Sequence, residues 1–159
     1  MSKVAVYIGF QIRCALSLYK ATDELVELAE LLQVPVMTTL LGKSGFPETH
    51  DLALGSGSGV MSGALFHFMR RSDVVFGIGC SFTRTNYGPK IPPGKVMVHS
   101  TNDPDDVNKA YKADYALIGD AKLVLQGLIA EIKDQTGGLG HRNDRDVSPE
   151  IKAVKKEWL

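Results

Sequence analysis

The sequence contains little cysteine and no excess of charge of either sign. Its 159 residues include only Cys14 and Cys80, too few for a disulfide scaffold or a four-cysteine zinc site. We therefore expect reduced thiols and a cytoplasmic location. Lysine and arginine together number 18, as do aspartate and glutamate, so the formal net charge is zero. Because binding to nucleic acid depends on clustered basic charge, we expect no nucleic-acid partner.

Long hydrophobic runs are also missing. The longest strongly apolar run covers residues 74–80, far short of the roughly 18–20 residues that span a bilayer. The amino-terminal residues have too short an apolar segment for a signal peptide and no small-residue cleavage site. We therefore expect no membrane association.

The sequence lacks a self-contained catalytic or metal-binding set. Gly-Lys-Ser at 42–44 has Met37 where a phosphate-binding P-loop needs glycine. The serines of 55–59 are out of phase with a nucleophile elbow, because Gly57 is central. The four histidines are scattered without metal-ligand spacing. We therefore predict no catalytic and no metal-ligating residue in this chain.

The composition, 44% hydrophobic and 23% charged, is typical of one globular domain. Short apolar runs alternate with stretches of helical spacing. The expected strands cover residues 4–9, 35–39, 73–79, 95–99 and 115–118, the expected helices cover 18–32, 60–71, 103–107 and 121–133, and residues 41–59 are expected to form turns. We therefore predict an α/β fold, with a Rossmann-like, doubly wound, mostly parallel six-stranded sheet and helices on both faces.

The composition changes near residue 135, which divides the chain. Residues 1–134 are expected to form the domain, and residues 135–159 a linker followed by the start of a helix that leads towards a missing domain. Ser148 is expected to cap this helix and Pro149 to occupy its first position. Its apolar stripe consists of Ile151, Val154, Trp158 and Leu159. The stripe needs a partner, which we expect outside this domain.

Glycine and hydroxyl residues gather at the expected carboxyl ends of the strands. They occur at Gly9, at 38–39, at 77–81, at 101–103 and at 119–120. In open parallel sheets these ends form the crevice in which ligands bind, and glycine lets a backbone approach phosphate closely. Each glycine alone is as well explained by a turn. Together the residues favour nucleotide binding, and the glycines of 55–59 add a second candidate anion site before a helix.

The same residues carry a family resemblance over about residues 3–133. The run from Pro35 through Thr-Thr at 38–39 and Phe-Pro-Glu-Thr-His at 46–50 to Gly55 is its most specific part. Residues 72–79, 95–99 and 119–122 follow in the same order. This pattern resembles the central domain of thiamine diphosphate-dependent enzymes, most closely the acetolactate synthase large subunit.

The resemblance implies a parent enzyme with three domains. Thiamine diphosphate and magnesium would lie between its pyrimidine-binding and diphosphate-binding domains, contributed by two subunits of a homo-oligomer. The family's metal motif is Gly-Asp-Gly, whereas Gly119 and Asp120 are followed by Ala121. The parent is thus expected to be a carboligase or decarboxylase, a transferase or lyase, and this chain alone is expected to be inactive.

The resemblance implies three possibilities for the central domain. Acetolactate synthase-like members bind FAD there, oxalyl-CoA decarboxylase-like members bind ADP, and several decarboxylases bind no ligand. Carried over by motif, the residues that would line the nucleotide crevice are Gly9, Thr39, Leu40, Gly79, Ser81, Asp103, Asp120 and Ala121. Three departures weaken FAD in particular. Bulky residues follow Gly9, Ser81 replaces the arginine of flavin-binding members, and Thr101 stands where an acidic residue is expected.

Two other classes remain open on the sequence. One is a free-standing adenine-nucleotide-binding module without thiamine chemistry, such as a regulatory subunit. The other is an independent Rossmann-type oxidoreductase, which is disfavoured because no Gly-x-Gly-x-x-Gly follows the first strand.

Overall fold

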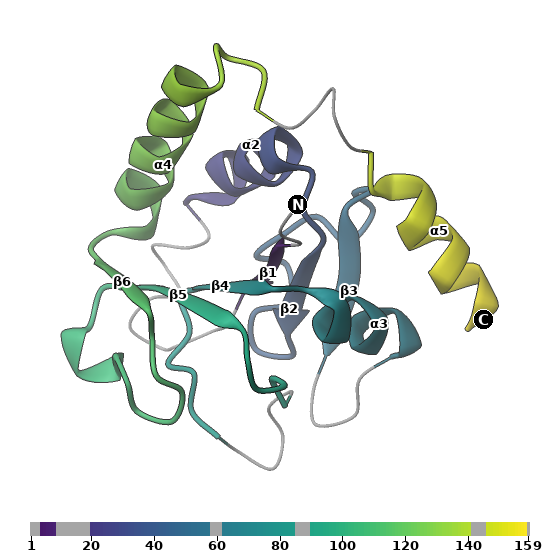
Figure 1. Ribbon diagram of the computed structural model, residues 1–159, viewed down its shortest axis with the longest axis horizontal. Coiled ribbons are helices and arrows are strands. Elements are labelled where there is room, and N and C mark those ends of the chain that lie inside the picture. Colours follow the sequence, from purple (N-terminus) through teal and green to yellow (C-terminus); the bar gives the residue numbers. More distant parts are fainter. Residues whose placement is uncertain (1–3, 9–19, 58–61, 85–89, 141–145, 159) are drawn as a thin grey trace.

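The computed structural model describes residues 4–8, 20–57, 62–84, 90–140 and 146–158. Its strands are β1 (Val4–Ile8), β2 (Val36–Thr39), β3 (Ala53–Gly57), β4 (Val74–Ile78), β5 (Val96–Thr101) and β6 (Tyr115–Ile118). Its helices are α2 (Thr22–Leu32), α3 (Gly63–Arg71), α4 (Ala121–Gln135) and α5 (Ser148–Glu157), with a 3-10 turn η1 (Pro104–Asp106). Figure 1 shows the sheet between the helices.

The strands pair in the order β3-β2-β1-β4-β5-β6, and every pair is parallel. This is the strand order of the dinucleotide-binding fold, in which the direction of winding reverses beside the first strand. The expected α/β class with parallel strands and helices is therefore confirmed. The connections β1→β2 and β3→β4 run in opposite directions along the sheet. Because both are expected to be right-handed, they must cross opposite faces of the sheet.

One face of the sheet is covered by α2 and α4, which pack against each other (Figure 1). Leu25 and Leu28 of α2 and Leu125 of α4 are fully buried. Ion pairs join Glu24 to Lys122 and Glu27 to Lys133 along the border of the two helices. Burial of these leucines supplies the main favourable free energy of this layer, since ion pairs close to the surface contribute little.

The other helical pair is α3 and α5. Helix α3 buries Leu65 and Met69, and α5 buries Ile151 and Val154. Glu150 of α5 lies 3.1 Å from the ring nitrogen of His67, and Lys155 donates to the backbone oxygen of Ala53 at 2.6 Å. The buried part of the apolar stripe of α5 thus finds its partner within this chain, whereas Trp158 remains 66% exposed.

Helix α5 begins differently from the expectation. The side chain of Ser148 does not cap it; instead Asp146 Oδ1 accepts hydrogen bonds from the backbone N–H and the hydroxyl of Ser148. The N-cap position is Val147, which makes no side-chain cap hydrogen bond, so the predicted cap at Ser148 was wrong by one residue, and Pro149 is the second rather than the first helical residue. An aspartate accepts more strongly than a hydroxyl, and its charge suits a helix amino terminus.

Strand β3 corrects a second expectation, because residues 41–59 were predicted to form turns throughout. Residues 53–57 pair instead with β2, with a register shift between Val36 and Met37. Gly55 adopts φ +95°, a left-handed conformation that glycine tolerates. Pairing with β2 overrides the low strand propensity of glycine and serine.

Helix α3 also starts later than residue 60, with Ser62 accepting a hydrogen bond from the N–H of Leu65. Within the described residues, none of the helices combines the length and the hydropathy needed to cross a membrane.

Candidate functional site

Seven of the eight predicted crevice residues lie at one edge of the sheet. Thr39 ends β2 and Leu40 follows it, Gly79 and Ser81 follow β4, and Asp103 follows β5. Asp120 and Ala121 stand between β6 and the first turn of α4. Because all strands are parallel, these positions share the carboxyl edge. Gly9 lies outside the described residues.

The turn after β4 is built on Gly79, whose φ is +61°. Its N–H donates to the backbone oxygen of Ser100 at 3.0 Å, so this N–H is engaged in extending the sheet. The hydroxyl groups of Ser81 and Thr83 are hydrogen-bonded to each other. Gly79 therefore allows the turn after β4, while Ser81 presents a hydroxyl at the carboxyl edge of the sheet.

A buried aromatic cluster lies beside this turn and was not predicted. Phe82 has φ +46° and is only 6% exposed, and its ring packs against Gly77. Its ring centroid lies 4.8 Å from that of His99 and 6.2 Å from that of Tyr111, both edge-to-face. The guanidinium of Arg84 stacks over Tyr111 at 4.9 Å. The segment that follows β4 thus covers this part of the sheet with its own side chains. The described residues form no helix at this place.

His99 is buried at the centre of the cluster. Its Nε2 lies 2.6 Å from the backbone oxygen of Cys80, so Nε2 carries the proton and donates. Burial lowers the pKa of His99 below its ordinary value, although the Cys80 carbonyl and the charge of Asp106 oppose this. The ring is thus held neutral near pH 7.

This pKa shift predicts how stability depends on pH. Between the lowered pKa of folded His99 and the ordinary value of 6.5, the unfolded chain binds a proton that the folded chain does not. The free energy of unfolding should therefore fall as pH decreases through this window, by at most about 1.4 kcal/mol per pH unit from this group. Urea unfolding of the wild type and of His99→Gln measures the difference, since glutamine can donate to Cys80 without titrating. Parallel pH profiles for both proteins would contradict the assignment to His99.

The two predicted acidic residues both cap helical turns. Asp103 Oδ1 accepts from the N–H of Asp105 at 3.0 Å, at the start of η1. Asp120 Oδ1 accepts from the N–H groups of Lys122 and Leu123, at the start of α4. Their carboxylates are thus fixed in place at the carboxyl edge by local hydrogen bonds. The sequence predicted that Gly119 and Asp120 cap the helix that follows and assigned both acidic residues to ligand binding, whereas the capping role of Asp103 was not predicted.

The end of β2 is likewise tied to its own loop. Thr39 Oγ1 accepts from the N–H of Gly42 at 3.0 Å, and the Thr38 and Ser56 hydroxyls lie 2.8 Å apart. Leu40 is 60% exposed at the same edge. An apolar side chain here offers a contact surface to a flat ring, while the threonine hydroxyl orders the turn.

Asp106 is a buried carboxylate that the sequence did not single out. Its side chain is fully buried and forms an ion pair with Lys109 through Oδ1. Among the described residues, Oδ2 has no hydrogen-bond partner. The only sequence signal was the acidic start of a short expected helix at 103–107, and such a pattern does not indicate burial.

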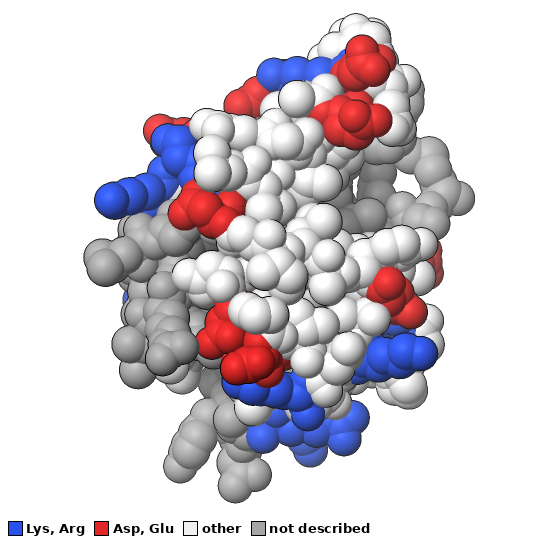
Figure 2. All heavy atoms as spheres, turned by 90° about the vertical axis from the view of Figure 1, so that its left-hand side faces the viewer, with Lys and Arg blue, Asp and Glu red and all other residues white. Residues whose placement is uncertain are grey.

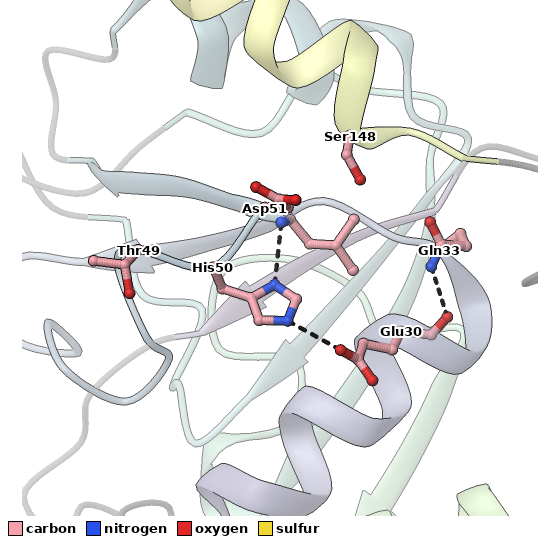
Figure 3. A pocket seen from close by; sticks show the side chains of 7 residues that line it. Glu30, Gln33, Thr49, His50, Asp51 and Ser148 are labelled. Carbon is pink, nitrogen blue, oxygen red and sulfur yellow. Dashed lines mark hydrogen bonds and ion pairs between the residues drawn. The ribbon is translucent and has the colours of Figure 1, made fainter.

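A pocket of about 530 Å³ lies at the opposite, amino edge of the sheet (Figure 3). Its lining residues are Glu30, Gln33, Thr49, His50, Asp51, Leu52 and Ser148. Leu52 N–H donates to Nδ1 of His50 at 3.1 Å, so Nε2 is the protonated nitrogen that faces Glu30 at 3.3 Å. Asp51 pairs with Lys152 of α5 at 3.0 Å. The polar groups of this pocket thus join α2, the loop before β3 and α5.

The described residues contain no group of three or more histidine, cysteine, aspartate or glutamate side chains that could hold a metal ion. The part of the chain that the structure describes therefore does not fit a magnesium–diphosphate centre, whose metal needs several oxygen ligands. No reaction step is assigned to this domain through such a group.

Comparison with known protein families gives a match over residues 2–128. The matching family is described as "Thiamine pyrophosphate enzyme, central domain". This match covers every strand of the sheet, all eight predicted crevice residues and the first part of α4. It ends before α5.

Several curated proteins are similar in sequence. A probable acetolactate synthase large subunit of Methanocaldococcus jannaschii is 39% identical over 122 residues, which are 72% of this chain and 21% of that protein. An acetolactate synthase of Mycobacterium bovis is 34% identical over 116 residues, 72% of this chain and 19% of that protein. An acetolactate synthase large subunit of Buchnera aphidicola is 34% identical over 119 residues, 72% of this chain and 20% of that protein. The chain thus spans about a fifth of the length of these relatives.

Proposed function

The chain belongs to the central-domain family of thiamine pyrophosphate enzymes, and we propose that it serves as the non-catalytic central domain of an acetolactate synthase-like enzyme. The observation that carries the proposal is the family match over residues 2–128. The parallel sheet in dinucleotide-binding order is consistent with it. The alternative of a free-standing nucleotide-binding module is not favoured, because the matched segment is about a fifth of each relative.

In this proposal the chemistry resides in partner domains. A pyrimidine-binding and a diphosphate-binding domain, from two subunits of a homo-oligomer in the cytoplasm, bind thiamine diphosphate and magnesium. The central domain joins them and contributes no catalytic residue.

The transcript that encodes this chain tests the proposal directly. We expect coding sequence for about 150–200 residues on each side, the size of a domain. The downstream part should carry Gly-Asp-Gly followed by Asn-Asn. Flanking sequence that encodes unrelated folds, or a stop codon directly after Leu159, would overturn the proposal.

We further propose that the carboxyl edge binds an adenine nucleotide, as FAD or ADP. Winding reverses between β1 and β4, and ligands of open α/β sheets bind outside the strand ends at this point. Ser81 supplies a hydroxyl next to this position, and Asp103 and Asp120 supply carboxylates that suit ribose hydroxyls. The exposed Leu40 can pack against a flat ring.

Between the two ligands, the residues fit ADP better than FAD. The face beside β4 is already filled by Phe82, Tyr111 and His99, so a flavin ring system would have to lie outside this cluster. Ser81 stands where flavin-binding members have arginine, which removes one cation from the phosphate-binding region.

A substitution at Ser81 tests whether this residue lies beside the phosphate groups of the nucleotide. Calorimetry with ADP and fluorescence quenching with FAD should show binding of ADP to the wild type and weaker or no binding of FAD. Ser81→Arg should tighten the binding of both nucleotides at least about tenfold, since a charge-assisted hydrogen bond to phosphate contributes about 1.5–3 kcal/mol. Gln135→Arg adds the same charge at the exposed carboxyl end of α4 and should change neither affinity.

Failure of the wild type to bind either ADP or FAD would overturn the nucleotide proposal and leave the structural role standing. An equal gain in affinity from Ser81→Arg and Gln135→Arg would show attraction by net charge alone, and would overturn the assignment of Ser81 to the crevice.

A further inference from the structure

Arg84 lies in the segment that follows β4 at the carboxyl edge of the sheet, and it is exposed. It stands three residues after Ser81, so the Cα atoms of the two residues are at most about 11 Å apart. The segment is folded more tightly than this limit, because the hydroxyls of Ser81 and Thr83 are hydrogen-bonded to each other and Phe82 adopts a left-handed conformation. The long side chain of Arg84 is therefore within reach of a ligand that is bound at Ser81.

Tyr111 holds the guanidinium of Arg84 in place. The central carbon of the guanidinium lies 4.9 Å from the ring centroid of Tyr111. Tyr111 is itself fixed, because its hydroxyl accepts from the N–H of Ile91 at 3.4 Å and its ring packs edge-to-face against Phe82. A stack of this kind uses the face of the guanidinium and leaves the N–H donors at its edge free to bind oxygen. Because the group is ordered before a ligand arrives, binding costs less conformational entropy.

The donors of Arg84 have no acceptor in the part of the chain that the structure describes, where the stack on Tyr111 is its one side-chain contact of this kind. Three lysines of the loops after β2 and β5 and of the first turn of α4 differ, because each forms an ion pair. The pairs are Lys43–Glu48, Lys109–Asp106 and Lys122–Glu24. On the side of the molecule that carries β6 and α4, Figure 2 shows acidic and basic side chains in mixed groups. Arg84 thus offers a cation that no described carboxylate engages.

We propose that Arg84 binds the phosphate groups of the nucleotide, an inference that rests on the nucleotide site proposed above. The cation that flavin-binding members carry at the position of Ser81 is then replaced by one that lies three residues later in the chain. A planar guanidinium binds two oxygens of a phosphate at once, and the hydroxyl of Ser81 adds a neutral donor beside it. A fork of this kind suits a terminal phosphate, which ADP has and FAD lacks. The ligand class is therefore a nucleoside diphosphate.

Calorimetry with ADP at low ionic strength tests this role of Arg84. Arg84→Met removes the charge and the donors but keeps an apolar side chain that can cover Tyr111, and it should weaken ADP binding at least about tenfold. The matched control is Arg70→Met. Arg70 is likewise exposed and stacked over a ring, that of Phe66 at 5.4 Å, but it lies at the end of α3, next to the amino end of β4. Its replacement should leave the affinity for ADP unchanged.

The same titrations at higher ionic strength distinguish a direct contact with phosphate from an altered fold. Because salt screens exposed charges, the affinity of the wild type and of Arg70→Met for ADP should fall with added salt, and that of Arg84→Met should fall less. Equal affinities of Arg84→Met and the wild type, or equal losses from Arg84→Met and Arg70→Met, would overturn the role of Arg84 and leave the nucleotide site standing. If the wild type binds no ADP at low ionic strength, the nucleotide site itself is wrong, and the role of Arg84 with it.

Discussion

Replacing Gly77 by alanine is expected to lower the free energy of unfolding by about 2–3 kcal/mol. A Cβ at this position would overlap the ring of Phe82 and lie 2.7 Å from Sγ of Cys80. Neither neighbour can move at low cost, because both are buried and Phe82 packs against His99 and Tyr111. Urea unfolding followed by circular dichroism measures the change.

Gly63→Ala is the matched control. Its Cβ would meet the ring of Trp158, but Trp158 is largely exposed and can swing away. Alanine also favours the first turn of α3 over glycine. We expect a change within about 0.5 kcal/mol for this variant. Equal destabilisation by Gly63→Ala and Gly77→Ala would contradict the explanation through buried overlap.

A double variant locates the overlap at Phe82. Phe82→Leu shortens the side chain that meets the new Cβ, so Gly77→Ala should cost less in the Phe82→Leu background than in the wild type. The coupling energy between two contacting core residues is about 0.5–3 kcal/mol. Strictly additive effects would show that Phe82 is not the obstacle.

The elements that could be predicted from the sequence are those with strong local patterns. Strands β4 and β6 are apolar runs, β5 begins with one, and α2 and α4 repeat leucine at helical spacing. Strand β3 has no such pattern. Its glycine and serine residues predict turns, and the segment becomes a strand only because β2 pairs with it. Long-range pairing of this kind leaves no local signal.

The candidate site could likewise be predicted only in part. Residues at strand ends could be assigned to the carboxyl edge because parallel order places all such ends together. Their hydrogen-bond partners could not be predicted, such as Ser100 for Gly79 or Asp105 for Asp103. The burial of Asp106 and the cluster around Phe82 depend on how loops fold back over the sheet, which residue types alone do not specify.

The apolar stripe of residues 151–159 was expected to need a partner outside the domain, whereas the structure packs its buried part against α3 of the same chain. Ile151 and Val154 are buried on the side of α5 that packs against α3. Helix α5 is thus anchored to this domain. This arrangement fits a central domain that holds its neighbours at fixed distances, which remains a proposal for the parent enzyme.

The anchoring of α5 depends on its buried contact with α3. Ile151→Asp should lower the free energy of unfolding by about 3 kcal/mol or release α5 from the domain, because it places an unpaired charge at a site that is 1% exposed. Ala153→Asp adds the same charge to the exposed side of α5 and should cost less than about 1 kcal/mol.

Trp158 allows the two outcomes of Ile151→Asp to be distinguished, since it is the single tryptophan of the chain and its ring lies against Gly63 of α3. In the wild type, tryptophan fluorescence and circular dichroism should change at the same urea concentration, as in a two-state transition. If Ile151→Asp releases α5, the fluorescence of Trp158 should change at lower urea than the main transition in circular dichroism, which follows the helices and strands of the whole domain. If α5 contributes nothing to the fold, Ile151→Asp and Ala153→Asp should behave alike.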